Sequence, residues 1–371
     1  MNEREQAHRF RTCRKTAVFA GLLALVSVTL SGCSDHAADG EGSHQAQVPI
    51  GAGLTGPTGT AAELVTSGPP NVSALAEDSL GRLWLATAAF TDTGTDAIYV
   101  VTNAGEGLLE VVPGMHTPMG LLWIDDELYV SSIEGITVFR GFDGSRFAEE
   151  ETILTFPGGG VAGSIVLGVD GRLRVGISAP CNACEPESRW AAAVVSFLPD
   201  GSGAEIEVSG IRAAVGLAYI PGTNDLLATM NQRDDLDELT PGDYLAVVAS
   251  GQDWGFPECF GQGGTACEGV PESVAELDDH AAVSGVAVLH AATGEFSAFV
   301  AEWGLTRVVR VNITRGDDGS YGGTAEPFLS GIQAPVAVVA SDGGTFLVGD
   351  WMTGAVYRVT PGPGGAVSGG S

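Results

Sequence analysis

The chain has 371 residues, with 46 Asp or Glu against 17 Lys or Arg, so its formal charge is −29 at pH 7. A field of this sign repels nucleic acid and anionic membrane surfaces, and it excludes both as partners. A cationic or neutral partner fits this composition better.

The N-terminal 32 residues have the pattern of a signal peptide. Five basic residues lie in the first 15 positions, and residues 16–30 form an apolar run without a charge. The run is about 15 residues long, which suits a signal peptide, whereas a membrane span needs roughly 20. Leu30-Ser31-Gly32-Cys33 then forms a lipobox, in which a small residue precedes a Cys whose thiol can accept a diacylglyceryl group. We therefore expect cleavage before Cys33 and a lipid anchor there; an ordinary signal peptide with a chance Cys is the alternative.

Cleavage would leave a strongly acidic protein at the cell envelope. The removed segment carries five basic and two acidic residues, so the mature chain has 12 Arg, no Lys and 44 Asp or Glu, a charge of about −32. We expect a monomer that faces the periplasm or the cell exterior and is held at the membrane by its lipid alone.

The mature chain divides into a tether, one domain and a tail. Residues 33–60 are rich in Gly, Ala and polar side chains, which is typical of a flexible tether, and residues 362–371 form a Gly-rich tail. Residues 61–361 contain short apolar segments separated by Gly, without helical periodicity. This pattern predicts one all-β domain, either a sandwich, a barrel or a propeller.

A sixfold repeat favours the propeller. Six segments share an acidic or small turn followed by a short apolar strand, and successive segments are 45, 45, 53, 72 and 48 residues apart. A four-stranded propeller blade takes roughly 40 to 50 residues, so we predict a six-bladed β-propeller with an insertion in the longest step. A β-sandwich with accidental spacing is the alternative. The markers are Leu83, Leu128, Leu173, Leu226, Ala298 and Phe346.

Four cysteines remain besides Cys33, and an exported protein can oxidise them. Their closeness in sequence predicts two short disulfides, Cys181–Cys184 and Cys259–Cys267. A redox-active pair or a zinc site remains the alternative for the CxxC pair.

An acidic loop follows the fourth marker. Four carboxylates fall within five positions there, and Ca²⁺ prefers six to eight oxygen ligands. The spacing does not match an EF-hand, so a solvated acidic loop is an equal alternative to a calcium site. The four residues are Asp234, Asp235, Asp237 and Glu238.

Several segments resemble the soluble quinoprotein glucose/sorbosone dehydrogenase family. They occur in the family's order, and the similarity covers residues 83–359. The resemblance implies a six-bladed propeller that binds pyrroloquinoline quinone (PQQ) with Ca²⁺ and oxidises a sugar or related carbonyl compound in the periplasm. The segments are residues 181–185, 199–203, 210–218, 231–236, 251–257, 279–286 and 299–301.

The chain departs from the family where catalysis is expected. Gly160 stands where the family has a general-base His, and Gly163 stands where it has an Arg. Ala213 replaces an Asn expected at the quinone, and Ala334 replaces a further Arg. The mature chain also has no Lys, although the quinone is a tricarboxylate that needs compensating positive charge. These departures make the chain a poor host for the cofactor.

The remaining candidates follow from the same resemblance. Arg212, Asn231 and Arg233 are the residues that it places toward the quinone, and His280 falls where the family also has a His. A structural role is the alternative for His280. The predicted function is therefore that of an envelope lipoprotein of the sugar-dehydrogenase type, divergent in catalysis.

Two alternatives to the dehydrogenase remain. One is a non-catalytic propeller that holds a carbohydrate or an envelope protein. The other is a lactonase-type metal site, with Asn231, Glu302 and Asp350 as its ligands. The sequence does not identify a substrate or an electron acceptor.

Overall fold

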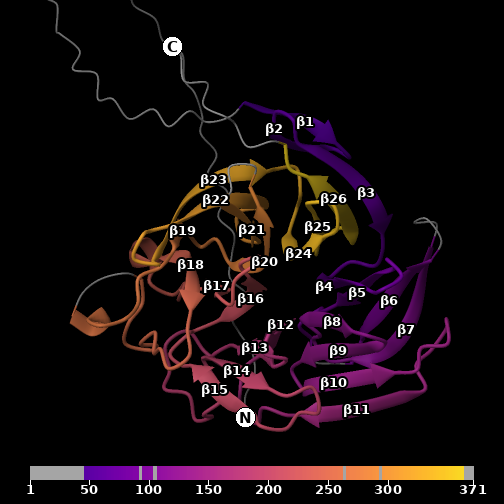
Figure 1. Ribbon diagram of the computed structural model, residues 1–371, viewed down its shortest axis with the longest axis horizontal. Helices are drawn as coiled ribbons and strands as arrows, with labels where there is room; N and C mark the ends of the chain where they lie inside the picture. Colours follow the sequence, from indigo (N-terminus) through magenta and orange to yellow (C-terminus); the bar gives the residue numbers. More distant parts are fainter. Residues whose placement is uncertain (1–45, 92–93, 103–106, 262–264, 292–294, 363–371) are drawn as a thin grey trace, which may run out of the picture. The chain divides into compact units, whose positions relative to one another are not determined.

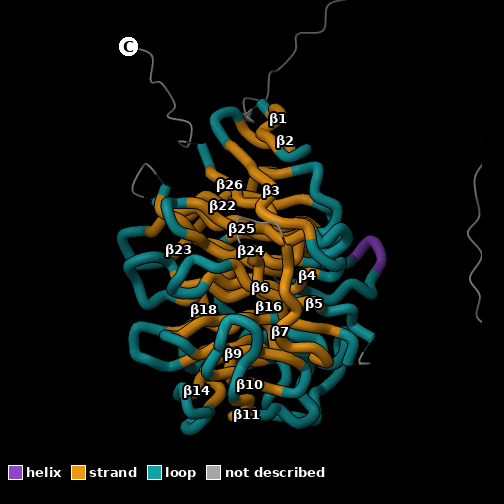
Figure 2. The backbone as a smooth tube through the Cα atoms, turned by 90° about the vertical axis from the view of Figure 1, so that its right-hand side faces the viewer, coloured by secondary structure: helices purple, strands orange, loops and turns teal. Residues whose placement is uncertain are grey.

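The computed structural model describes residues 46–91, 94–102, 107–261, 265–291 and 295–362. Almost all of this part is strand or loop, with two short 3-10 helices, η2 (Asp237–Leu239) and η3 (Thr265–Cys267) (Figure 2). The predicted signal peptide and Cys33 lie outside the described residues. Within those residues no helix has the length and apolarity to cross a membrane.

Six four-stranded antiparallel sheets are arranged around a common centre as the blades of a propeller (Figure 1). Blade 1 is β4 (Val72–Glu77), β5 (Leu83–Thr87), β6 (Asp96–Thr102) and β7 (Gly107–Met115). Blade 2 is β8 (Gly120–Ile124), β9 (Glu127–Ser132), β10 (Gly135–Arg140) and β11 (Glu149–Leu154). Blade 3 is β12 (Ala162–Leu167), β13 (Leu173–Ile177), β14 (Ala193–Phe197) and β15 (Glu205–Val208).

The other blades follow the same order. Blade 4 is β16 (Ala214–Tyr219), β17 (Leu226–Met230), β18 (Gly242–Val248) and β19 (Ala275–Asp279). Blade 5 is β20 (Val283–His290), β21 (Phe296–Glu302), β22 (Arg307–Arg315) and β23 (Tyr321–Leu329). Blade 6 is β24 (Pro335–Ser341), β25 (Thr345–Asp350), β26 (Ala355–Thr360) and β3 (Ala61–Ser67). The predicted six-bladed propeller is confirmed.

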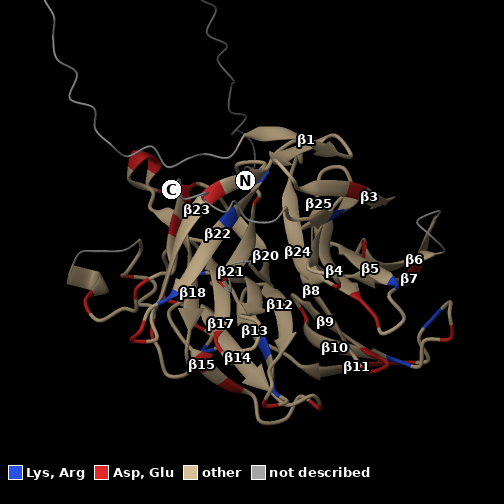
Figure 3. Cartoon of the chain, turned by 45° about the horizontal axis from the view of Figure 1, so that its top comes forward, with Lys and Arg blue, Asp and Glu red and all other residues tan. Residues whose placement is uncertain are grey.

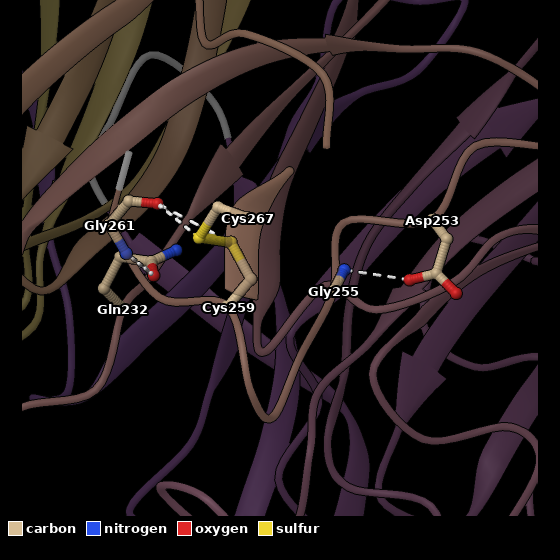
Figure 4. Close-up of a disulfide and its surroundings, with 6 residues drawn as sticks. All are labelled: Gln232, Asp253, Gly255, Cys259, Gly261 and Cys267. Atoms are coloured by element: carbon tan, nitrogen blue, oxygen red, sulfur yellow. Dashed lines mark hydrogen bonds between the residues drawn. A yellow bond between two sulfur atoms is a disulfide. The ribbon is translucent and has the colours of Figure 1, made fainter. Parts of the chain in front are cut away.

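The six sequence markers all lie in the second strands of their blades. The longest step between markers contains the connection from β18 to β19, which is fastened by the Cys259–Cys267 disulfide (Figure 4). The backbone N–H of Gly261 in this insertion donates to the Gln232 side chain at 3.0 Å. The insertion is therefore attached to the loop that follows β17.

The N-terminal strand closes the ring. β3 pairs with β26 from Ala61↔Thr360 to Ser67↔Ala355, so the two ends of the domain share blade 6, and Figure 1 shows the indigo strand beside the yellow one. The sequence repeat did not reveal this closure, because β3 is separated from the other strands of its blade by the whole domain.

Part of the predicted tether is folded. β1 (Gln47–Gly51) and β2 (Leu54–Pro57) form a hairpin within residues 33–60, a segment whose composition predicts a flexible tether. Ile50 and Leu54 of this hairpin are buried against Phe328 and Leu329 of blade 5. Burial of these apolar side chains orders the segment despite its Gly-rich composition.

Apolar layers between consecutive blades hold the ring together. Successive side chains of a strand point to opposite faces of its blade. Because each blade is flanked by two others, its strands need apolar residues on both faces. In the layer between blades 1 and 2, for example, Trp84 packs with Leu128 and Phe139. Corresponding clusters lie at the other five junctions, including the one that joins blade 6 to blade 1. The core is thus divided into six layers.

The inner strands approach one another closely around the central channel. A Cβ atom on Gly216 would lie 2.3 Å from the carbonyl oxygen of Ser284, and one on Gly285 would lie 2.4 Å from the backbone nitrogen of Val338. Only glycine permits this approach. The inner strands consequently leave a cavity of only about 320 Å³ between them.

Buried aspartates connect neighbouring blades. Asp243 accepts backbone N–H groups from Gln232 of blade 4 at 2.7 Å and from Val283 of blade 5 at 3.0 Å. Asp96 makes the same kind of connection between blades 1 and 2. It accepts the backbone N–H groups of Ala89, which follows β5, and of Thr117, which precedes β8. These carboxylates are structural and do not reach a ligand site.

Asp243 should make stability depend on pH. Burial raises the pKa of Asp243 to about 6, although the two backbone donors oppose the shift. The folded protein therefore binds this proton more tightly than the unfolded chain, and the stability from Asp243 is lost as pH rises from about 4 to about 6, by about 3 kcal/mol. We expect the free energy of unfolding, measured in urea at pH 4 to 7, to fall less with pH in Asp243→Asn. Parallel curves for the two proteins would contradict this expectation.

Candidate functional site

A cavity of about 740 Å³ opens at the end of the channel where the inner strands begin and the second strands end. Its apolar floor is formed by Met119, Val161, Val215 and Val336, each from a different blade or its flanking loop. Polar and aromatic side chains surround this floor. They are Phe90, Ser178, Asn182, Arg212, Asn231, Ser284, Trp303 and Trp351.

Arg212 is the only charged side chain among the described residues that line the cavity. Its Nη1 donates to the carbonyl oxygen of Asn231 at 3.3 Å, and its Nη2 donates to Oδ1 of Asn182. Its Nε is buried without a hydrogen-bond partner in the described structure. Burial lowers the pKa of the Arg212 guanidinium, while the carboxylates of Asp234 and Asp243 oppose this shift.

The lack of a direct ion pair distinguishes Arg212 from most arginines of this acidic chain. Ten other arginines form ion pairs with Asp or Glu. Arg212 forms none with the carboxylates that the structure describes. Asp and Glu are spread widely over the blades and loops (Figure 3). The described lining of the cavity, whose charged side chain is Arg212, therefore differs in sign from the protein as a whole.

Asn182 joins the loops of blades 3 and 4. It accepts from Arg212, and its Nδ2 donates to Oδ1 of Asp234 at 2.8 Å. The Cys181–Cys184 disulfide brackets this residue and is present as predicted, as is Cys259–Cys267. Asn182 therefore positions the guanidinium at the cavity wall.

Three aromatic side chains surround the mouth of the cavity. Phe90 and Trp303 are exposed, whereas Trp351 is half-buried and donates its Nε1 hydrogen to the carbonyl oxygen of Ala88 at 2.8 Å. The rings of Trp303 and Trp351 meet edge to face, with centroids 6.3 Å apart. Exposed aromatic rings beside a cavity provide flat apolar faces for a ligand.

Of the three predicted quinone contacts, Arg212 and Asn231 line the cavity and Arg233 does not. Arg233 pairs with Asp235 at 2.8 Å and lies over the ring of Phe260. Its charge is used within its own loop, so the structure does not bring Arg233 to the cavity with Arg212 and Asn231.

The predicted calcium cluster is not assembled. Asp234 is bonded to Asn182 and Asp235 to Arg233, while Asp237 and Glu238 are exposed in η2. In the described part of the chain, no three His, Cys, Asp or Glu side chains gather as a metal site. Neighbouring positions on this loop point to different partners in the described structure.

His280 is exposed in the turn between β19 and β20 and does not line the cavity. The catalytic role predicted for it is therefore not supported. The lactonase-type cage is also absent: Glu302 is buried in an ion pair with Arg307, and Asp350 accepts backbone N–H groups including that of Gln333.

The surrounding backbone leaves no room for a side chain at two positions where the family carries catalytic side chains. A Cβ atom on Gly160 would lie 2.3 Å from the carbonyl oxygen of Ser178, and one on Gly163 would lie 2.6 Å from that of Val215. The His and Arg that the resemblance implies are therefore absent from the sequence and would also lack space here.

Sequence reasoning assigned no role to Asn182, Phe90, Trp303 or Trp351, although these residues define the cavity. An aromatic residue in a turn directly after an apolar strand is the only local signal, and Trp303 and Trp351 both show it. Their convergence depends on the arrangement of the blades.

The cavity residues do not fit the quinone that the resemblance implies. The cofactor is a tricarboxylate, and the described lining offers it a single guanidinium whose Nη atoms are already hydrogen-bonded. No His, Asp, Glu or Lys lines the described cavity, so it also lacks a side chain that could accept the substrate proton.

No protein-family model matches the chain. No curated protein matches it either. Solved structures do match: the holo form of the PQQ domain of pyranose dehydrogenase from Coprinopsis cinerea has a TM-score of 0.67 and 12% identity, over 84% of this chain and 98% of that one. The PQQ-bound aldose sugar dehydrogenase of Streptomyces coelicolor gives 0.65 and 18%, over 82% and 99%.

A Trichoderma reesei enzyme of the carbohydrate-active family AA12 gives a TM-score of 0.66 and 16% identity, over 86% of this chain and 98% of that one. Likenesses at these identities establish a shared fold. The chain has the six-bladed propeller fold of PQQ-dependent soluble sugar dehydrogenases, which confirms the architecture that the sequence resemblance implied.

Proposed function

We propose that this protein is a lipid-anchored envelope protein whose propeller binds a small carbohydrate-type ligand without oxidising it. The observation that carries the proposal is the composition of the channel-mouth cavity. It combines aromatic faces at Trp303 and Trp351 with the donors and acceptors of Asn182, Arg212 and Asn231, and no described lining residue is a general base.

This set of groups suits a sugar. A sugar ring presents C–H groups on its faces and hydroxyls around its edge, so it can pack on an aromatic ring while amide and guanidinium groups bind the hydroxyls. The volume of about 740 Å³ falls within the range of small-molecule sites. The sugar-dehydrogenase fold of the structural neighbours supports the same ligand class.

Binding should depend on Arg212 and Trp303. We expect Arg212→Ala to weaken binding by about tenfold or more, since a hydrogen bond to a charged group contributes about 1.5–3 kcal/mol. Trp303→Ala should also weaken binding, because it removes an aromatic face on which the sugar ring packs. The measurement is calorimetry, supported by tryptophan fluorescence, with neutral aldoses, uronic acids and short oligosaccharides. Phe260→Ala is the matched control, because Phe260 is exposed but lies outside the cavity. Absence of binding across the panel would overturn the proposal.

A PQQ-dependent dehydrogenase is the second candidate. The Nε of Arg212, which is buried without a hydrogen-bond partner in the described structure, favours it because a carboxylate of the cofactor could accept from this group. Reduction of a dye in the presence of PQQ, Ca²⁺ and a sugar separates this candidate from simple binding.

Membrane attachment should require Cys33. We expect Cys33→Ala to abolish incorporation of labelled fatty acid and to move the protein out of the membrane fraction, because the thiol is the proposed acceptor of the lipid. Cys13→Ala is a suitable control, since Cys13 lies within the predicted signal peptide. Equal labelling of wild type and Cys33→Ala would remove the lipid anchor from the proposal.

A further inference from the structure

The Cys181–Cys184 disulfide lies at the wall of the cavity. It belongs to the connection between β13 and β14, and Cys181 lines the cavity while Cys184 is exposed. Cys184 is therefore the residue of this disulfide that is more open to solvent. The second disulfide is less open to solvent, because Cys259 is only 4% exposed and Cys267 is half-buried.

The local backbone favours opening of this bond at Cys184. The backbone N–H of Cys184 donates to Sγ of Cys181 at 2.8 Å. If an incoming thiolate attacks Sγ of Cys184, Cys181 leaves as a thiolate that this N–H already contacts. Stabilising the leaving thiolate accelerates thiol–disulfide exchange, and the CxxC spacing is typical of redox-active pairs.

If its role were purely structural, this disulfide would add little to the stability of the fold. It joins residues only three apart, whereas Cys259 and Cys267 are eight apart. A cross-link over a shorter loop restricts the unfolded chain less. Its contribution to folding therefore does not account for this disulfide, and its position beside the cavity suggests another role.

The disulfide also controls a contact of the cavity. Asn182, between the two cysteines, accepts from Arg212 and donates to Asp234. Closing the CxxC ring fixes the backbone on both sides of Asn182. Opening the ring would remove this restraint on Asn182, so the Arg212 guanidinium would no longer be held in place by it.

We propose that Cys181–Cys184 is a thiol-exchange site that controls the geometry of the cavity. A dithiol of the cell envelope attacks Sγ of Cys184, the Cys181–Cys184 bond breaks, and Cys181 takes up a proton after leaving as a thiolate. The second thiol of the reductant resolves the mixed disulfide. The protein thus gains two thiols while the dithiol becomes a disulfide, and Asn182 then releases Arg212. This inference does not depend on which ligand the cavity binds.

The test uses the full-length lipoprotein in detergent micelles, titrated with dithiothreitol. Differential alkylation and mass spectrometry should show Cys181 and Cys184 reduced at about a tenfold lower dithiol concentration than Cys259 and Cys267. In that first step, hydrogen exchange should increase in peptides that contain residues 178–192 and Arg212. The same increase around Arg212 is expected in oxidised Asn182→Ala, whose disulfide is intact.

Two results would overturn the proposal. One is that both disulfides open together, over the same range of dithiothreitol concentration. The other is that Cys181–Cys184 opens first without any change of exchange around Arg212. Since no ligand is used, neither result bears on carbohydrate binding, which calorimetry tests separately.

Discussion

With PQQ and Ca²⁺ supplied, the wild-type protein should oxidise sugars at least about 10²-fold more slowly than an active sugar dehydrogenase of the same fold. General-base catalysis contributes about 10² to 10⁴ in rate, and no described residue of the cavity wall can supply it. The single guanidinium of Arg212 should also hold a tricarboxylate weakly. The measurement is dye reduction with aldoses, sorbosone and simple alcohols.

Two variants test the physical reason for this inactivity. Gly160→His should fail to restore turnover and should lower the free energy of unfolding by about 1–3 kcal/mol, because its Cβ would lie 2.3 Å from the Ser178 carbonyl oxygen. His280→Ala should change neither property, since His280 is exposed outside the cavity. Rapid turnover that survives His280→Ala would contradict both the missing base and the binding function.

Trp84→Ala should lower the free energy of unfolding by about 3–5 kcal/mol. Trp84 is fully buried between blades 1 and 2. The centroid of its ring lies 5.0 Å from that of Trp123 and 4.9 Å from that of Phe142. Its Nε1 also donates to Oδ2 of Asp78 at 2.8 Å. Removal of the ring leaves a cavity in an apolar layer and takes away one of the two donors to Oδ2 of Asp78, the other being Nε of Arg82. Urea unfolding measures the change.

The matched variants separate ring packing from the hydrogen bond. Trp84→Phe retains an aromatic ring but loses the donor to Asp78, so its destabilisation should be smaller than that of Trp84→Ala. Trp303→Ala should change the free energy of unfolding by less than about 0.5 kcal/mol, because Trp303 is 43% exposed. Equal destabilisation by Trp84→Ala and Trp303→Ala would show that the layer between blades does not carry the stability assigned to it.

Local patterns in the sequence were sufficient for the blades and the disulfides. An acidic or small turn before a short apolar strand marks the second strand of every blade, because each blade must form the same turn and bury the same strand between its neighbours. The cysteine pairs were predictable for a similar reason, since partners three and eight residues apart cannot lie far from each other. Periodicity and proximity are properties that a sequence displays directly.

The closure of the ring and the site were decided by tertiary structure. β3 completes blade 6 from the opposite end of the domain, and the hairpin of β1 and β2 is ordered by a surface formed largely by blade 5. Arg233 and Arg212 are equally basic in the sequence, yet one is neutralised by Asp235 while the other is held at the cavity by Asn182.

The same holds for the residues that the site lacks. A sequence comparison can show that Gly160 replaces a His, but only the path of the Ser178 backbone shows that the space for a side chain has closed. The direction and surroundings of a side chain depend on atoms that come from distant parts of the chain. Residue type and spacing therefore determined the propeller, whereas packing between blades determined which of its polar groups meet at the cavity.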